Sequence, residues 1–592
     1  MRKVIMMGLC LLMGHVLAYA QRSLYRETDL AEVGPLSNAE EKALQNFRNN
    51  PEVAEITVVK VDFSAFKSSR FSLSYHQTAT VATEELREMH DASPDDFSWF
   101  GKLSDETGVF FTVIGRQLAS KFYMGNVPML IVPLRRDYHL LVAYKNSIDQ
   151  GVCGLEKMEL GTPIKGPGKF STERIEMVDD ACLMRVLWIV TAQAEPEISM
   201  ALELAARMLQ DETNLAYLNS QINYRMEMAR VERTSYVETT ANTTATAYGV
   251  TSSYPSDLIN LSTGAGLLSA VPTLRNLYQA DIVVMVRSQA TNTAQGFYGI
   301  AYGVPVDPNV LNAGNAFCII STQYMIGGRF TFAHEMGHVQ GARHDNHAAA
   351  PTYARGYVFS TAANNNRTIM AVGGSCNPPT GCRVQYFSNP NVTYGGIPVG
   401  VAGQYENYRR INETGQQVRN FRMTDSNLLL PNETYANEIL ARHLATSTIS
   451  TNNSTVVAQN GSRVSMRAGA SVTLMPGFSA EAGSVFTAYI SDCVTPTTSK
   501  EAEVTGDAAE GPMQVAVSPN PTTGRISVRI VQGLPTRPCT VQAMDMMGRV
   551  VTVKVMDSGT CELDLSVHPA GAYFVVVDSP DGQRQTVKVL RQ

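Results

Sequence analysis

The chain has 592 residues, of which 44% are hydrophobic and 17% charged, and its formal net charge is −6. This length exceeds what one hydrophobic core supports, so several globular domains are expected. The mild charge offers neither the basic footprint of a nucleic-acid binder nor a polybasic membrane patch, so no nucleic-acid partner is predicted.

The N-terminus has the pattern of a secretory signal. Arg2 and Lys3 precede an apolar run, and Ala18-Tyr19-Ala20 forms a small-x-small cleavage site. We therefore predict a signal peptide over residues 1–20 and export by the Sec route. The apolar run is too short to span a bilayer, and no later stretch reaches the roughly 20 apolar residues required, so no integral membrane segment is expected.

Residues 21–181 are predicted to form a β-rich domain that carries no catalytic motif. A polar helix is expected over 38–49, and alternating patterns predict strands over 56–61 and 109–113. Cys153 lies near the end of this region, between Gly151-Val152 and Gly154.

Residues 182–424 alternate between helical and strand patterns. A buried strand is predicted over 183–192, a long helix over 198–218, a strand over 281–286 and a last helix over 405–422. This alternation predicts an α/β domain with a twisted mixed sheet backed by helices.

Within this domain, the segment from His334 to His344 holds three imidazoles and a carboxylate at spacings that suit metal-assisted hydrolysis. Residues four apart lie on one face of a helix, so His334 and His338 can bind one ion. Gly341 can take the left-handed conformation that ends a helix, which lets His344 return as the third ligand. The fourth position then stays open for water, and Glu335 can act as general base and later as acid.

These residues predict one catalytic Zn²⁺ ion. Two alternatives stay open on the residues alone. One is a His-rich amphipathic helix with a capping glycine, and the other is a binding protein that keeps the metal site without activity.

The segment resembles the H-E-x-x-H-x-x-G-x-x-H signature of the metzincin zinc proteases, and Asp345 after the third His resembles their reprolysin-like, adamalysin-related bacterial branch. The resemblance implies a methionine turn beneath the metal, which we assign to Met370. It also implies a substrate-binding edge strand, matched by Gly299, Ile300, Ala301 and Tyr302. Residues 386–396 resemble the segment that lines the pocket after the scissile bond.

The same resemblance implies that residues 21–181 are a propeptide, with Cys153 as a possible latch on the open metal position. A disulfide partner is the alternative role for this cysteine. Some bacterial relatives cut before acidic residues, and Arg383 and Arg409 are the nearby cations, for which a solvated surface position is predicted. Calcium is left undecided because no contiguous acidic loop is present.

Beyond residue 424 the composition turns to Ser, Thr, Asn and Gly. Residues 425–494 are predicted to be a small β module and residues 495–512 a linker. Residues 513–592 resemble the C-terminal sorting domain of the type IX secretion system, with a small immunoglobulin-like β-sandwich expected. Two disulfides are suggested, Cys376 with Cys382 and Cys539 with Cys561.

The expected protein is thus a secreted or outer-membrane cell-surface zinc endopeptidase that cleaves extracellular proteins, with the type IX machinery as its export partner. The alternative is a surface adhesin whose metzincin domain is inactive. Stoichiometric zinc with chelator-sensitive proteolysis distinguishes the two.

Overall fold

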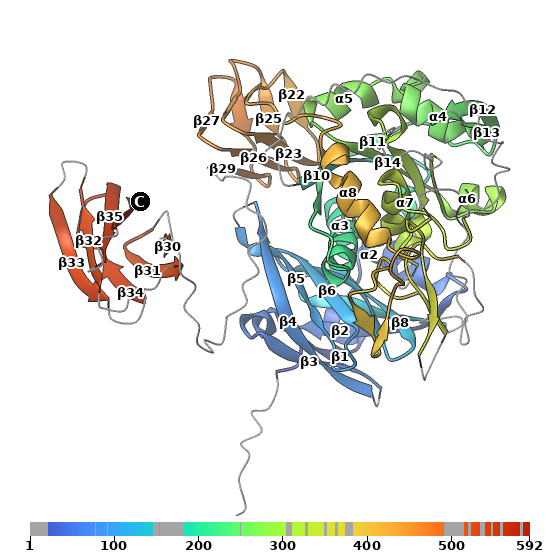
Figure 1. Ribbon diagram of the computed structural model, residues 1–592, viewed down its shortest axis with the longest axis horizontal. Helices are drawn as coiled ribbons and strands as arrows, with labels where there is room; N and C mark the ends of the chain where they lie inside the picture. The colour runs from blue at the N-terminus through green and yellow to red at the C-terminus, as the bar shows by residue number, and fades with distance from the viewer. Residues whose placement is uncertain are drawn as a thin grey trace, which may run out of the picture. The chain divides into compact units, whose positions relative to one another are not determined.

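A computed structural model of the chain divides into two compact units, Met1–Ser499 and Lys500–Gln592 (Figure 1). It describes residues 22–145, 153, 155, 183–302, 311–325, 329–347, 352–372, 383–490 and 514–591, apart from positions 77, 92, 249, 362–364, 438, 519–521, 533–538, 546–548, 557–559 and 580–583. The predicted signal peptide, the predicted linker and the Cys376–Cys382 pair lie outside the described residues.

The N-terminal region of the first unit is a nine-stranded antiparallel sheet in the order β1-β2-β9-β8-β7-β6-β5-β4-β3. One face of this sheet forms a core of its own around Trp99 and Phe111, while Phe100 and Phe110 on the other face join the core of the following domain. Its helices are α1 (Leu30–Val33) and α2 (Asn38–Arg48). Its strands are β1 (Tyr25–Thr28), β2 (Val53–Val61), β3 (Arg70–Tyr75), β4 (Thr78–His90), β5 (Ser93–Lys102), β6 (Gly108–Ile114), β7 (Gln117–Met124), β8 (Val127–Arg135) and β9 (Tyr138–Tyr144).

The next domain is built on a mixed sheet that begins β15-β16-β14-β10-β11. Strands β11, β10, β14 and β16 run parallel, and β15 pairs antiparallel with β16 at the outer edge. The strands are β10 (Leu183–Thr191), β11 (Arg225–Thr234), β14 (Ile282–Arg287), β15 (Gly299–Ala301) and β16 (Phe317–Ser321). Three short strand pairs lie outside this sheet: β12 (Asn242–Ala247) with β13 (Val250–Pro255), β17 (Val358–Ser360) with β18 (Asn365–Arg367), and β19 (Thr393–Tyr394) with β20 (Ile397–Pro398).

Helices pack on this sheet as the alternating pattern predicts. The long helix α3 contacts β11 on one side and β6 and β7 of the N-terminal sheet on the other. The short helix α7 packs against β15, β16 and α3. The helices are α3 (Leu202–Asn219), α4 (Ser256–Thr263), α5 (Val271–Leu277), α6 (Gln289–Gln295), α7 (Thr331–Val339) and α8 (Asn407–Arg419).

The sheet continues past residue 424, because β23 pairs antiparallel with β11 and is followed by β26 and β29. In residues 427–490, each strand of the first two turns pairs in parallel with the strand one turn later, on three separate sides. This module is therefore a three-sided parallel β-helix of three turns, which the sequence analysis did not foresee. Its turns are β21 (Asn427–Leu429), β22 (Glu433–Tyr435), β23 (Leu440–Ala445); β24 (Thr448–Ser450), β25 (Val456–Ala458), β26 (Arg463–Ala468); and β27 (Ser471–Thr473), β28 (Phe478–Ala480), β29 (Val485–Ile490).

The second unit has a three-stranded sheet, β30-β31-β34, and a four-stranded sheet, β33-β32-β35-β36, which share one hydrophobic core. Cys561 is a free thiol, so the predicted Cys539–Cys561 disulfide is wrong; the two residues belong to strands of different sheets. The strands are β30 (Gln514–Ser518), β31 (Arg525–Gln532), β32 (Cys539–Met544), β33 (Val550–Met556), β34 (Thr560–Asp564), β35 (Gly571–Asp578) and β36 (Arg584–Arg591).

Among the described residues, no helix combines the length and the apolar content needed to cross a membrane.

Candidate metal centre

The centre is built on α7, all nine residues of which are buried. His334 and His338 are one turn apart on this helix, and Glu335 lies between them in sequence. The helix ends at Gln340, and Gly341 follows with a φ of +88°. A Cβ at Gly341 would lie 2.5 Å from Nε of Arg410. Both the left-handed backbone and this close approach require glycine, and the chain then turns back toward the helix.

Three imidazoles converge on one point at the end of this turn. His344 Nε2 lies 3.1 Å from His334 Nε2 and 3.0 Å from His338 Nε2. The three side chains are 3%, 3% and 7% exposed in chain order. The sequence-predicted ligands are thus brought together in a buried pocket.

The hydrogen bonds of the Nδ1 atoms determine whether the Nε2 atoms of the same rings can bind a metal ion. His334 Nδ1 lies 2.8 Å from the Ile369 carbonyl and His338 Nδ1 lies 3.0 Å from the Ala342 carbonyl. A carbonyl oxygen only accepts, so each Nδ1 must carry the proton and donate it. Each Nε2 of these two rings therefore presents a lone pair to the common point.

Burial keeps these imidazoles uncharged. Burial lowers the pKa of His338 to about 3 and lowers the pKa values of His334 and His344 well below the usual range, with further contributions from the neighbouring imidazoles and from Arg383. Neutral imidazoles about 3 Å apart with lone pairs directed at one point suit a shared cation. The donor set therefore fits a zinc ion.

Glu335 faces the edge strand β15. Its side chain is 1% exposed, and a Cβ built at Gly299 would lie 2.5 Å from Glu335 Oε1. Gly299 thus leaves room for the carboxylate beside the backbone of the strand. Ile300 and Ala301 complete β15. Tyr302 follows the strand, and its hydroxyl lies 2.7 Å from Ser262 Oγ.

Met370 lies against the underside of α7 and is fully buried. A Cβ at Gly337 would lie 2.5 Å from Met370 Sδ and 3.0 Å from Phe387 Cε1. Gly337 is therefore a packing requirement that the sequence analysis missed, although its place between the two helical histidines was visible. Asp345 Oδ1 accepts a hydrogen bond of 2.8 Å from Val372 N, which ties the loop of the third His to the methionine turn.

Cys153 is close enough to be a fourth ligand. Its Sγ lies 3.5 Å from His338 Nε2, and the four candidate ligand atoms all lie within 4.8 Å of one another. The backbone of Cys153 forms a parallel bridge with Gly299. Cys153 itself therefore lies beside the edge strand β15.

Arg383 is buried, at 4% exposure, so the expectation of a solvated surface arginine is wrong for this residue. Its guanidinium donates to the carbonyls of Arg329 and Ala371, at 3.0 and 3.3 Å. Arg409 is exposed as expected and pairs with Glu413 at 2.9 Å. His347 lies in a loop after the third ligand, also as expected.

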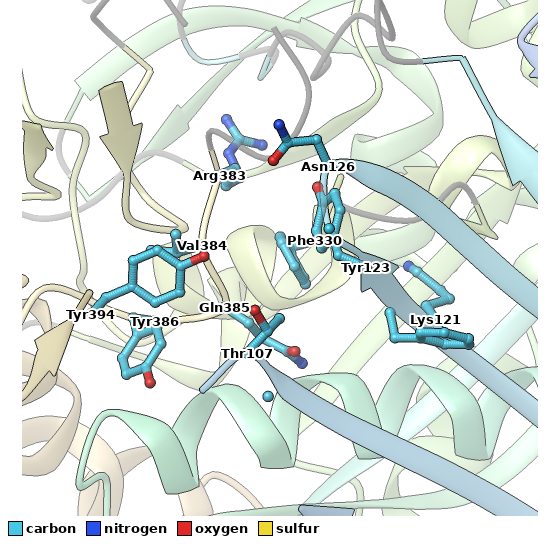
Figure 2. A pocket seen from close by; sticks show the side chains of 13 residues that line it. Thr107, Lys121, Tyr123, Asn126, Phe330, Arg383, Val384, Gln385, Tyr386 and Tyr394 are labelled. Atoms are coloured by element: carbon cyan, nitrogen blue, oxygen red, sulfur yellow. The ribbon is translucent and has the colours of Figure 1, made fainter. Parts of the chain in front are cut away.

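Arg383 lines a small cavity of about 40 Å³ between the catalytic and N-terminal regions. Phe330, Tyr386 and Tyr394 line the same cavity. Figure 2 shows Arg383 beside Asn126, with Tyr123 of the N-terminal sheet filling the space next to Phe330. Side chains of the N-terminal region and of the catalytic region therefore line this cavity together.

Comparison with known families identifies two regions. Residues 192–388 match metallo-peptidase family M12, and residues 516–591 match a secretion system C-terminal sorting domain. The first match contains the three histidines, Glu335 and Met370, whereas Cys153 lies outside it.

The chain is also similar to characterised relatives. It is 27% identical over 421 residues to a peptidyl-Asp metalloendopeptidase of Xanthomonas campestris pv. campestris, covering 64% of this chain and 89% of the relative. A peptidyl-Asp metalloendopeptidase of Stenotrophomonas maltophilia is 30% identical over 245 residues, covering 40% of this chain and 52% of the relative. Among solved structures, metalloproteinase-II from Bacteroides fragilis matches 58% of this chain and 90% of its own length, with 11% identity and a TM-score of 0.33.

Proposed function

We propose that this chain is a secreted zinc endopeptidase made as a latent precursor, and that it belongs to metallo-peptidase family M12, whose model matches residues 192–388. The convergence of three buried Nε2 atoms on one point carries the proposal. The family and the relatives make the domain a metalloendopeptidase, and they do not favour the alternative of an inactive adhesin.

We assign His334, His338 and His344 as the zinc ligands. A zinc ion held by them supplies a Lewis acid for peptide hydrolysis. Glu335 takes the proton of the attacking water at its carboxylate and then gives it to the leaving amine. Burial of Glu335 beside β15 supports this role, because a substrate strand paired with β15 brings its scissile carbonyl next to the carboxylate. Met370 keeps an apolar floor under the imidazoles, and Gly341 allows the turn to the third ligand.

We further propose that residues 21–181 are a propeptide and that Cys153 is its latch. Two observations support this role: Cys153 Sγ lies within 4.8 Å of the candidate ligand atoms of all three histidines, and the Cys153 backbone bridges Gly299 of the proposed substrate edge. Both contacts have to break before a substrate can bind. Loss of the thiol from the metal centre is then the activating step.

The relatives are named for action at Asp, and we propose an acidic preference for this chain as well. Arg383 is the residue that supports it. The guanidinium is buried, contributes to the lowered pKa values of His334 and His344, and lines a cavity whose other walls include side chains of the proposed propeptide. Removal of those side chains opens the cavity, and a carboxylate entering it would gain a charged hydrogen-bond partner.

Residues 516–591 imply secretion or display at the cell surface through the type IX system. We propose that the signal peptide over residues 1–20 brings the chain to that machinery. We also propose that the second unit is an immunoglobulin-like β-sandwich and that the type IX machinery recognises it. Protein or peptide substrates outside the cell are the proposed targets.

The decisive experiment compares the purified, processed protein with its Glu335→Gln variant. We expect both to bind one equivalent of zinc, and the variant to lose about 10²–10⁴-fold in the rate of peptide hydrolysis. A chelator should abolish wild-type activity, and added zinc should restore it. Retained hydrolysis in Glu335→Gln, or a processed protein without zinc, contradicts the proposal.

A further inference from the structure

Three parts of the first unit meet at a buried cluster of charges away from the metal centre. Arg207 comes from α3, Arg442 from β23, and Arg463 from β26. We call these three residues the arginine notch. Asp91, in the turn between β4 and β5, and Asp96, near the start of β5, contact the notch from the proposed propeptide. We call the segment that carries these two residues the Asp91–Asp96 turn.

The contacts of Asp91 are charged and desolvated. Arg207 Nη2 donates to Asp91 Oδ2 at 2.5 Å, and Arg442 donates to both oxygens, with Nε 3.1 Å from Oδ1 and Nη2 3.1 Å from Oδ2. The side chains of Arg207, Arg442 and Asp91 are 0%, 4% and 4% exposed. Burial alone would raise the pKa of Asp91, but the two guanidiniums outweigh it and hold this pKa well below its usual range.

Asp96 makes the second contact. Arg463 donates to Asp96 Oδ2, and its Nε also donates to Glu203 Oε2 on α3 at 2.8 Å. The register of the β-helix explains how the arginines gather. Leu440 is paired with Arg463, and Arg442 with Ser465, so the two notch arginines of this module project from one face of neighbouring parallel strands.

Positive charge is in excess on the side of the cluster that remains after processing. That side holds five arginines against three carboxylates: Arg185, Arg207, Arg442, Arg463 and Arg467 with Glu203, Glu227 and Asp281. Asp91 and Asp96 therefore compensate an excess of two positive charges. A buried cation without a partner is costly, so their departure leaves a strongly anion-attracting surface.

Resting on the proposed removal of residues 21–181, we infer that the arginine notch is an exosite of the processed enzyme for acidic peptide segments, which the Asp91–Asp96 turn fills in the precursor. The ligand class is a peptide with two carboxylates about five residues apart, as in this turn. Such a site lets the processed enzyme bind acidic proteins at a place separate from the metal centre. It also makes the β-helix module part of substrate recruitment.

The test uses the full chain with a specific protease site placed between Lys145 and Leu183, before and after cutting and removal of the propeptide. The probe is a fluorescent peptide with the sequence of residues 88–98, and the control probe carries Asn in place of both Asp91 and Asp96. We expect the first probe to bind the processed chain about tenfold or more tightly than the control probe, with a strong salt dependence. The uncut chain should bind neither probe well, because its own turn fills the notch.

Variants test the assignment on the protein side. Arg442→Gln should weaken binding of the acidic probe about tenfold or more, and Arg463→Gln, which has the more exposed side chain, provides a second variant if the first does not fold. Arg409→Gln removes the same charge from an exposed site on α8 and should leave binding unchanged.

Equal binding of the two probes, equal binding by cut and uncut chain, absent binding, or no effect of the notch variants would each overturn the exosite. Hydrolysis of a short neutral peptide is measured on the same samples. Inactive protein that still binds the acidic probe would refute the proposed function and leave the exosite intact.

Discussion

The helices α3 and α7 are both buried over most of their length, but their polar side chains are satisfied in different ways. On α7, His334 and His338 direct their Nδ1 protons at carbonyls of the same domain. On α3, Arg207 and Glu212 meet Asp91 and Lys121 of the N-terminal sheet. The Nδ1 protons on α7 are accepted within the same domain, whereas the charged side chains of α3 pair with a region that we propose is removed.

The spacing of charged residues on α3 explains why this helix suits both the proposed precursor and the processed enzyme. Glu203, Arg207 and Asp211 are four residues apart and lie on one face, which is the pattern of a solvent-facing helix surface. In the precursor this face is covered, and buried charges are tolerated only when paired. In the proposed precursor the partners come from the turn after β4 (Asp91), from β5 (Ser98), from β6 (Thr112) and from β7 (Lys121). The difference teaches that the outer ring nitrogens of α7 keep one environment, whereas the charged face of α3 is suited to two successive ones.

The largest expected effect is the loss of zinc and activity when a proposed ligand on α7 is removed. His338→Ala removes a proposed zinc ligand, so we expect zinc loss and a drop in peptide hydrolysis of about a thousandfold or more. In the same variant, the cut propeptide should stay bound nearly as tightly as in the wild type, because its contacts with α3 are unchanged. Zinc analysis, activity and size-exclusion chromatography of the cut chain measure the three quantities.

His347→Ala is the matched control for that prediction, since this histidine follows the third ligand in a loop. Full zinc binding in His338→Ala, or equal loss in both variants, would break the assignment of the ligands.

The second effect concerns the α3 side. Lys121 and Glu212 form a fully buried pair of 2.5 Å, with 1% and 0% exposure. Lys121→Met leaves a buried carboxylate without its partner, so we expect the propeptide to be held about 2–5 kcal/mol less tightly. Release of the propeptide from the cut chain on dilution measures this change, and activity of the processed enzyme should be unaffected.

Lys102→Met is the control, because Lys102 pairs with Glu85 at 3.1 Å, both side chains are 36% exposed, and both residues lie in the N-terminal sheet, not on α3. We expect at most about 1 kcal/mol from it. If Lys102→Met and Lys121→Met weaken propeptide binding to a similar degree, the burial of the Lys121–Glu212 pair does not determine how tightly the propeptide is held.

A pH dependence should come from Asp211 on the same face. Burial raises its pKa to about 7, although Ser98 and Thr112 each donate to it at 2.5 Å, and Glu88 and Arg207 are its charged neighbours. A raised carboxyl pKa means that its contribution is complete below the unfolded value near 3.8 and is lost as the pH rises through about 7. Propeptide retention should therefore strengthen by roughly 1–3 kcal/mol from pH 8 to pH 5.

His90 opposes this trend, because burial lowers its pKa well below 6.5 and uptake of a proton is easier once the propeptide leaves. The informative quantity is thus the difference between the wild type and Asp211→Asn over this pH range. If the two proteins have parallel pH profiles, Asp211 does not titrate in the contact.

The smallest expected effect concerns selectivity at the metal centre. Arg383→Gln should lower kcat/KM for peptides with Asp next to the scissile bond about 10- to 100-fold relative to their Asn analogues, with the rate on neutral peptides less affected. Digestion of a peptide library followed by mass spectrometry measures the preference. Arg409→Gln is the exposed control, and an unchanged preference for Asp in Arg383→Gln would exclude Arg383 as its source.

Much of the catalytic domain was predictable because its signals are local. The strand β14, the helix α3 and the mixed sheet follow from periodicity, and the ligand set follows from spacing on one helix. The β-helix was missed because its signal is a weak repeat. Gly461-Ser462 and Gly483-Ser484 recur at corresponding positions of successive turns, where Asn437 and Asn460 lie below the two glycines.

The burial of Arg383 and the arginine notch could not be read from the sequence. An arginine is more often exposed than buried, and its burial depends on partners from remote segments. Asp91 and Arg442 are 351 residues apart, and no local pattern links them.

The sequence by itself determined the chemistry, because three histidines, a glutamate and a glycine at helical spacing leave few other uses for these side chains. Only the tertiary structure decided which side chains surround that centre, that Cys153 reaches it, and that the outer face of α3 is covered. Periodicity is a local property of the chain, whereas the pairing of buried charges depends on which distant segments the fold brings together.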